Sequence, residues 1–232
     1  MAGVLDATPH HGNPLLTEPG VSLTDYALAA ECALFSYLIY FRNWPASRLR
    51  LWFGVFFASL GLASLFRGTV HGFFLDQTSV GSRILWPATM LAIGGASFAA
   101  WLAGAAVLLP RRAARIVGMA ALAQSIAYGG FVLAGAHDFT VAVMNYLPAS
   151  IFLLALFAVS YARQRGGRAL VGLIGIVSTF IAAGVQQAGL ALHPVYFNHN
   201  ALYHLIRGLA LFLIFWSVPA LAAAEVTKRP QC

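Results

Sequence analysis

Seven long apolar segments, separated by short polar connections, constrain this chain more than any other feature. They cover residues 24–41, 51–75, 83–109, 114–135, 139–162, 169–191 and 199–224. Each segment reaches the roughly 17–25 residues that a membrane-spanning helix requires. Only 9% of the residues are charged, against about 25% in soluble domains. We therefore predict an all-α polytopic membrane protein.

The short connections make successive helices antiparallel, so we expect a single bundle. We predict an extramembrane N-terminal tail over residues 1–21, a seven-helix transmembrane domain over residues 22–225 and a short cytoplasmic tail over residues 226–232. Ser22 and Asp25 have the spacing of a capping box, in which two side chains bind the first free backbone amides of a helix. This spacing assigns Asp25 to the cap of the first helix.

Positive charge is unevenly divided between the two sets of connections. Eleven Lys and Arg residues follow the first, third, fifth and seventh segments, whereas Arg83 alone lies on the other side. The eleven are Arg42, Arg48, Arg50, Arg111, Arg112, Arg115, Arg163, Arg165, Arg168, Lys228 and Arg229. Because Lys and Arg concentrate in cytoplasmic loops, we predict the N-terminus outside, the C-terminus in the cytoplasm and a location in the bacterial inner (plasma) membrane. The same division explains the net charge of +7 without a nucleic-acid partner.

Residues 198–207, at the start of the last segment, are unusually polar. By helical phase, Asn200, His204 and Arg207 fall on one face of this helix. Polar groups in a membrane helix face a protein interior or a water-filled cavity, because exposure to lipid is costly. This stretch therefore predicts a buried polar site near the outer end of the bundle.

Other polar residues are expected at the same depth. Arg67 and His71 lie in the outer third of the second segment, and the first segment carries Glu31. A charge near the membrane centre costs about 2.5–3.5 kcal/mol on insertion scales, so we expect Glu31 to pair with Arg67 or Arg207.

Polar residues in the fourth, fifth and sixth segments fit two interpretations. They could line a cavity that opens toward the outside, or they could form hydrogen bonds between helices. The residues are Gln124, Ser125, Tyr128, Asn145, Tyr146, Gln186 and Gln187.

The sequences Arg67-Gly68-Thr69-Val70-His71 and Asn200-Ala201-Leu202-Tyr203-His204 resemble two motifs of one superfamily. It joins the alkaline ceramidases with the progestin and adipoQ receptors. Its members have seven membrane helices and a zinc-dependent amide hydrolase site, with Ser-x-x-x-His on the second helix, Asp on the third and His-x-x-x-His on the seventh. Here Arg67 replaces Ser, Asn200 replaces the first His, and the third segment has no Asp. The resemblance implies a divergent bacterial-type member with an altered or lost zinc site.

The leading functional hypothesis is an outward-facing polar cavity that binds a membrane lipid or a small amphipathic molecule. Arg67 and Arg207 would hold an anionic head group, Asn200 and Tyr203 would orient it, and Glu31 would balance the charge.

The histidines support two alternatives, because imidazole can ligate a metal, donate a proton and accept one. A metal-dependent lipid amide or ester hydrolase would place zinc on His71 and His204, with His199 or Asp76 as third ligand. A haem-binding redox protein would place haem between the same two histidines. A retinal protein is disfavoured, because the last segment has no lysine for a Schiff base.

Overall fold

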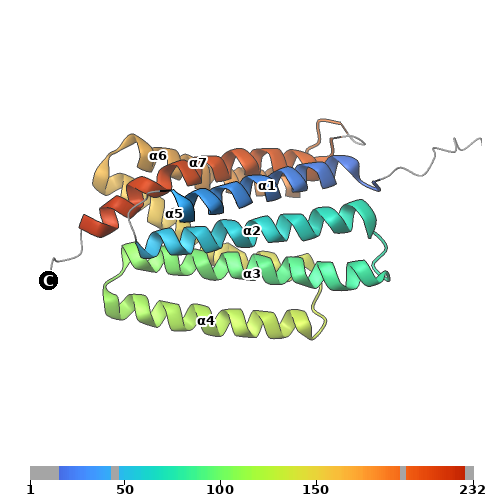
Figure 1. Ribbon diagram of the computed structural model, residues 1–232, viewed down its shortest axis with the longest axis horizontal. Coiled ribbons are helices and arrows are strands. Elements are labelled where there is room, and N and C mark those ends of the chain that lie inside the picture. Colours follow the sequence, from blue (N-terminus) through green and yellow to red (C-terminus); the bar gives the residue numbers. More distant parts are fainter. Residues whose placement is uncertain (1–15, 43–46, 194–196, 228–232) are drawn as a thin grey trace, which may run out of the picture.

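The structure is a computed structural model that describes residues 16–42, 47–193 and 197–227. Within these residues it contains seven helices and one isolated bridge between His193 and Phe197. The helices are α1 (Pro19–Phe41), α2 (Arg48–Phe73), α3 (Val80–Leu108), α4 (Arg111–Leu133), α5 (Phe139–Gln164), α6 (Gly167–Gln187) and α7 (His199–Thr227), as Figure 1 shows. Each helix lies over one of the predicted apolar segments, which confirms the all-α prediction.

The first helix begins earlier than the capping-box spacing predicts. α1 starts at Pro19, with Glu18 in the N-cap position. Proline suits the first turn of a helix, because its missing amide would have no intrahelical partner there. Ser22 and Asp25 consequently lie inside α1, and both are buried. The assignment of Asp25 to a cap is therefore wrong.

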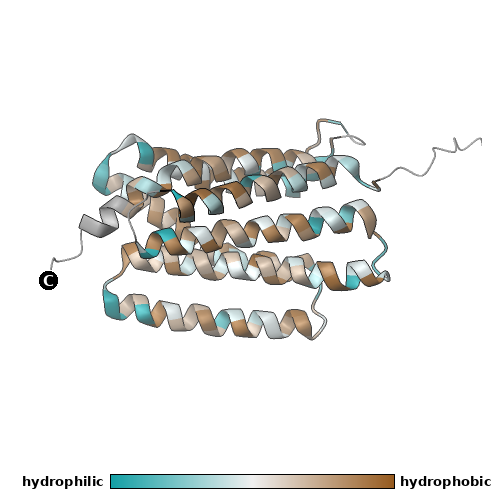
Figure 2. Ribbon diagram, viewed as in Figure 1, coloured by the Kyte–Doolittle hydropathy of each residue, from teal (hydrophilic) through white to brown (hydrophobic). Residues whose placement is uncertain are grey.

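Six of the described helices, α2 to α7, are long and apolar enough to cross a membrane. α1 carries Asp25 and Glu31 and is not one of the six. Brown, apolar residues predominate along the helices in Figure 2, whereas teal residues gather toward the ends of the bundle. Large apolar side chains such as Ile126 and Phe131 are more than half exposed on the outer side of α4. A surface of this kind fits lipid rather than water, and the protein is a multi-pass membrane protein.

Six helices form a ring in the order α1, α2, α3, α5, α6 and α7, which closes from α7 back to α1. α2 also touches α7 across the ring. α4 packs on α3 from outside and lies at the edge of the bundle in Figure 1. The interior of the bundle is therefore bounded by helices other than α4.

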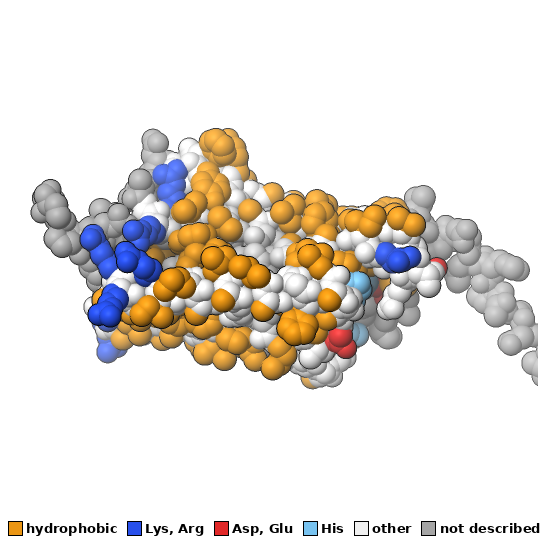
Figure 3. All heavy atoms as spheres, turned by 90° about the horizontal axis from the view of Figure 1, so that it is seen from below, with side chains coloured by type: hydrophobic (Ala, Val, Ile, Leu, Met, Phe, Trp, Pro, Cys, Tyr) orange, Lys and Arg blue, Asp and Glu red, His pale blue; other side chains and the backbone are white. Residues whose placement is uncertain are grey.

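Aromatic side chains fill the interior toward one end. The rings of Phe35 and Phe215 stack with their centroids 4.3 Å apart, and Phe57 meets Phe35 edge-on at 5.4 Å. Phe53 and Phe157 are fully buried in the same cluster. α1, α3 and α5 end here, α2, α4 and α6 begin here, and most Lys and Arg side chains in Figure 3 gather at this end. We call this end the arginine end, and we call the opposite end, where α1 and α7 begin, the cavity end.

Candidate functional site

A cavity of about 420 Å³ occupies the interior near the cavity end. Its walls come from α2, α3, α5, α6 and α7, and not from α1 or α4. Four of the five predicted ligand residues line it: Arg67, Asn200, Tyr203 and Arg207. His199 lines it as well, whereas Glu31, His71 and His204 do not.

Arg67 and Asp25 form a buried ion pair beside this cavity. The Asp25 side chain is 0% exposed and that of Arg67 is 12% exposed. The Arg67 guanidinium donates from Nε to both carboxylate oxygens, at 3.2 and 3.1 Å, and from Nη2 to Oδ1 at 2.7 Å. Gly68 permits this approach, because a Cβ there would lie 2.8 Å from the Asp25 Cβ. The prediction that Glu31 is the partner of Arg67 is wrong, since Asp25 takes this place.

His204 completes this network as a neutral imidazole. Arg67 Nη2 contacts His204 Nε2. A guanidinium has no acceptor, so Nε2 must accept and Nδ1 must carry the proton. Nδ1 lies 2.8 Å from the Thr24 hydroxyl, which itself donates to the Gly20 carbonyl at 2.8 Å. Arg67 and Thr24 thus satisfy the two ring nitrogens of His204, and His204 adds no charge.

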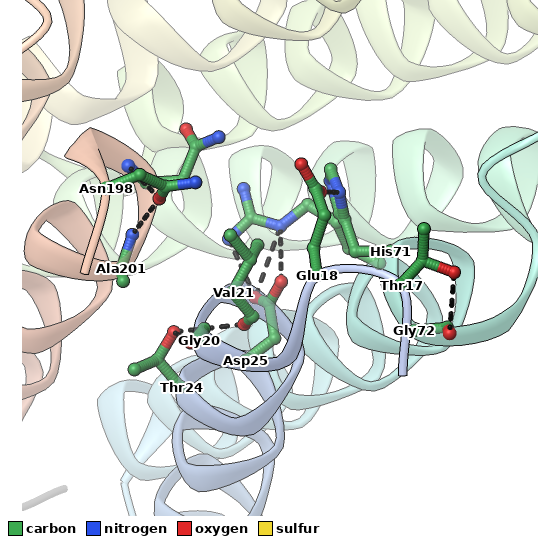
Figure 4. Close-up of polar contacts among 12 residues, drawn as sticks. Thr17, Glu18, Gly20, Val21, Thr24, Asp25, His71, Gly72, Asn198 and Ala201 are labelled. Atoms are coloured by element: carbon green, nitrogen blue, oxygen red, sulfur yellow. Dashed lines mark hydrogen bonds and ion pairs between the residues drawn. The ribbon is translucent and has the colours of Figure 1, made fainter. Parts of the chain in front are cut away.

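His71 binds a different part of the chain. Its Nδ1 contacts a carboxylate oxygen of Glu18, as Figure 4 shows. The same short segment before α1 also donates backbone amides to the end of α2: Thr17 to the Gly72 carbonyl at 3.0 Å, and Glu18 to the His71 carbonyl at 3.3 Å. Carbonyls in the last turn of a helix lack intrahelical partners, and this segment supplies them.

The predicted zinc ligands do not meet around one point. His71 and His204 are engaged with Glu18 and Arg67, while Asp76 is exposed and accepts bonds from Thr78. The Thr78 amide and hydroxyl lower the pKa of the Asp76 carboxyl. Among the described residues, no three His, Cys, Asp or Glu side chains are placed to hold a metal ion. The Arg67 guanidinium, which contacts His204, would also repel a cation. This donor set does not fit a tetrahedral zinc site.

Arg207 is the second arginine on the cavity wall. Its Nη1 donates to the Tyr203 hydroxyl at 2.6 Å. Its guanidinium carbon lies 5.6 Å from the centre of the Tyr203 ring and 5.8 Å from that of Tyr146. Within residues 16–42, 47–193 and 197–222, no carboxylate lies within 4 Å of it. Its charge is therefore solvated by aromatic rings and a phenol rather than matched by an anion.

Glu31 faces Gly208, the residue that follows Arg207 in α7. A Cβ built on Gly208 would be 3.0 Å from Glu31 Oε2, which places the carboxylate between α1 and α7. Among the described side chains it forms no ion pair. The predicted pairing of Glu31 with Arg207 is thus wrong as well.

Amide side chains order the start of α7. Asn198 Oδ1 accepts from the backbone amides of Asn200 and Ala201, each at 3.1 Å, which caps the helix (Figure 4). Gln186 donates to Asn200 Oδ1 at 2.9 Å and so ties α6 to α7 at the cavity wall. Asn198 was not among the predicted site residues, although Asn before an apolar run is a typical cap signal.

Two polar residues of α4, Gln124 and Tyr128, hold helices together, whereas Ser125 donates to the Ala121 carbonyl of its own helix. Gln124 donates to the backbone and side-chain oxygens of Asn145, at 3.0 and 2.8 Å. Tyr128 donates to the Met90 carbonyl at 2.8 Å. In α5 and α6, by contrast, Tyr146 and Gln186 line the cavity. Asn145 of α5 belongs to the interhelical bonds, and Gln186 does both, because it lines the cavity and also donates to Asn200 of α7.

A family model described as a family of unknown function, DUF6962, matches residues 21–223. The chain belongs to this family. No curated protein and no solved structure matches it. The matched residues of this DUF6962 member run from the start of α1 to the last turns of α7, so they include the Asp25–Arg67–His204 network and the cavity wall.

Proposed function

We propose that this protein binds an anionic amphipathic molecule in the cavity, with the anionic group on Arg207. The observation that carries the proposal is the unmatched guanidinium of Arg207 on the wall of a 420 Å³ cavity. An arginine within a membrane bundle costs about 2.5–3.5 kcal/mol on insertion scales. A bound carboxylate or phosphodiester would offset this cost with charge-assisted hydrogen bonds.

Arg67 has a different part in this proposal from the one the sequence suggested. Asp25 neutralises its charge, so Arg67 shapes the wall without adding net attraction for an anion. Tyr203 lies between the two arginines, with its ring 5.9 Å from Arg67 and 5.6 Å from Arg207. Tyr203 and Asn200 offer a hydroxyl and an amide beside the proposed anion site.

The remaining walls suit a hydrocarbon chain. Leu60, Ile93 and Phe180 line the cavity with apolar surface. Two further lining residues of α5, Val143 and Leu147, are 37% and 39% exposed. Partly exposed apolar residues in this wall favour entry beside α5, directly from the membrane. A membrane lipid or another amphiphile dissolved in the bilayer would enter this way.

The proposed orientation places the cavity end outside and the arginine end in the cytoplasm of a bacterium. The unequal numbers of arginines at the two ends support it. α1 is proposed as the seventh span: its 23 residues extend about 34 Å, against a hydrocarbon core of about 30 Å. Its Asp25 is matched by Arg67, which makes a buried position tolerable.

Binding of a fluorescent fatty acid to the purified, delipidated protein in neutral detergent tests the proposal. Dansyl-undecanoic acid is the probe, and its uncharged methyl ester is the ligand control. We expect the Arg207→Gln variant to bind the acid roughly tenfold or more weakly, because one charge-assisted contact is lost. The Arg83→Gln variant removes an exposed cation at the cavity end and should bind normally. Equal affinities of the wild type and Arg207→Gln, or equal binding of acid and ester, would refute the proposal.

A further inference from the structure

A second hollow lies at the arginine end, between α2, α3 and α4. Its volume is about 540 Å³. α4 packs against α3 but makes no comparable contact with α2. Gly118 of α4 lies close to α3, since a Cβ there would be 3.3 Å from Leu102. The space between α2 and α4 therefore forms a groove whose floor is α3.

Three arginines line this groove: Arg48 from α2, and Arg111 and Arg115 from α4. The sequence has no Asp or Glu between residues 32 and 75 or between residues 77 and 137. Within the part of the chain that the structure describes, no carboxylate pairs with any of the three. The three guanidinium groups thus concentrate positive charge that the surrounding helices do not neutralise.

The other walls of the groove are apolar. The rings of Trp52 and Phe98 meet edge-on with their centroids 5.7 Å apart. Along α4, Met119 and Leu122 continue the wall toward the middle of the membrane and are 58% and 51% exposed. These side chains follow Arg111 and Arg115 at helical spacing, so the charged part lies at the end of the bundle and the apolar part at membrane depth.

We propose that this groove binds a phospholipid with an anionic head group from the leaflet at the arginine end. Guanidinium groups bind phosphate through paired hydrogen bonds, and Arg48, Arg111 and Arg115 supply three of them. An acyl chain lies along Trp52 and Met119. Basic pockets between membrane helices recognise anionic lipids by this combination of charge and apolar surface. The proposal does not depend on the ligand of the central cavity.

Two features select the lipid over other phosphate sources. A free phosphate ion could satisfy the arginines, but it would leave the apolar wall of Trp52, Phe98 and Leu122 without a partner. A zwitterionic phospholipid such as phosphatidylcholine carries a cationic group, which three nearby guanidinium groups repel. The groove therefore favours a lipid with a net negative charge, such as phosphatidylglycerol.

Thermal unfolding of the delipidated protein in neutral detergent tests this assignment. The probes are phosphatidylglycerol, phosphatidylcholine and inorganic phosphate. All proteins compared carry Arg207→Gln, so that ligand binding in the central cavity contributes as little as possible to the change in Tm. We expect phosphatidylglycerol to raise the Tm of this background protein, and we expect the other two probes to have little effect. An equal rise with phosphatidylcholine would refute head-group recognition, and an equal rise with phosphate would refute a lipid site.

The decisive comparison is between two triple variants that remove equal charge from the same end of the bundle. The groove variant is Arg48→Gln, Arg111→Gln and Arg115→Gln. The control variant is Arg163→Gln, Arg165→Gln and Arg168→Gln, three exposed residues at the end of α5, in the α5–α6 connection and at the start of α6. The groove variant should need roughly tenfold or more phosphatidylglycerol for half of the rise in Tm, and the control should match the background.

Equal effects of the two triple variants would refute the proposed lipid site and indicate that anionic lipid is attracted by the overall positive charge at this end. If the groove variant does not fold, the single variant Arg115→Gln serves instead, with Arg168→Gln as its control. Mass spectrometry of the phospholipids that copurify provides an independent measurement. If the groove binds phosphatidylglycerol, this lipid is retained by the background protein and depleted in the groove variant or in Arg115→Gln. Equal retention would contradict it.

Discussion

Replacement of Asp25 by Asn should be among the most destabilising single changes in the chain. The Asp25 carboxylate is fully buried and accepts three hydrogen bonds from Arg67. Removal of one partner from a buried ion pair costs about 3–5 kcal/mol, because the remaining charge stays buried without a counter-ion. The amide oxygen of the substituted side chain could still accept one bond from Arg67, which places the expected loss toward the lower end of this range.

The matched control is Glu31→Gln, in the same helix. Glu31 forms no ion pair among the described side chains, so its neutralisation should change stability by less than about 1 kcal/mol. Both variants are compared in equilibrium unfolding of the purified protein in mixed micelles of neutral and anionic detergent, followed by tryptophan fluorescence. If Glu31→Gln costs as much as Asp25→Asn, the assignment of the ion pair is wrong.

A double variant separates the ion pair from simple loss of packing. Asp25→Asn combined with Arg67→Gln leaves no unpaired charge, so much of the lost stability should return. The two single changes should therefore couple strongly, since the side chains touch. Additive effects of the two changes would refute the argument even if each change alone were destabilising.

Two further predictions concern the bundle as a whole. Reporter fusions at the two ends of the chain should lie on opposite sides of the membrane, and ends on the same side would refute the seven-span proposal. Gly175→Ala should destabilise by about 1–3 kcal/mol in the same unfolding assay, because the new Cβ would lie 2.9 Å from the Ala210 carbonyl of α7. Gly184→Ala is its control: a Cβ there meets nothing within 4 Å, so this variant should be neutral or slightly stabilising.

The positions of the helices could be predicted from the sequence because membrane spans are defined by local composition. Long apolar runs and short polar turns mark them without knowledge of the packing. The start of α1 was misplaced for a local reason, since Ser22 and Asp25 match a capping box, whereas Pro19 begins the helix. Asn198 gave a cap signal at the start of α7 that the structure contains.

The sequence also indicates which of the two carboxylates of α1, Asp25 or Glu31, pairs with Arg67. Asp25 shares a helical stripe with Leu28, Cys32 and Phe35, and all four are buried. Glu31 falls outside this stripe and is only partly buried. The cost of burying a charge correctly predicted an ion pair, but helical phase decides which carboxylate faces Arg67.

Contacts between distant segments could not be predicted in this way. One broad face of α7 carries Asn200, His204 and Arg207. His204 nevertheless contacts Arg67 of α2 and Thr24 of α1, whereas Arg207 faces the cavity. Which half of that face meets which helix depends on the ring order of the bundle. The contact of Glu18 with His71 likewise depends on how the segment before α1 lies over the end of α2.

The charges around the cavity restrict the ligand further. Arg67 and Asp25 together are neutral, and the proton arrangement makes His204 neutral too. With His199 counted as neutral, the unmatched charge on the cavity wall is the single positive charge of Arg207, among the residues that the structure describes. A bound monoanion balances it, whereas a dianion would leave one negative charge in a largely apolar cavity, at considerable cost. A carboxylate or a phosphodiester thus suits the proposed site better than a phosphate monoester.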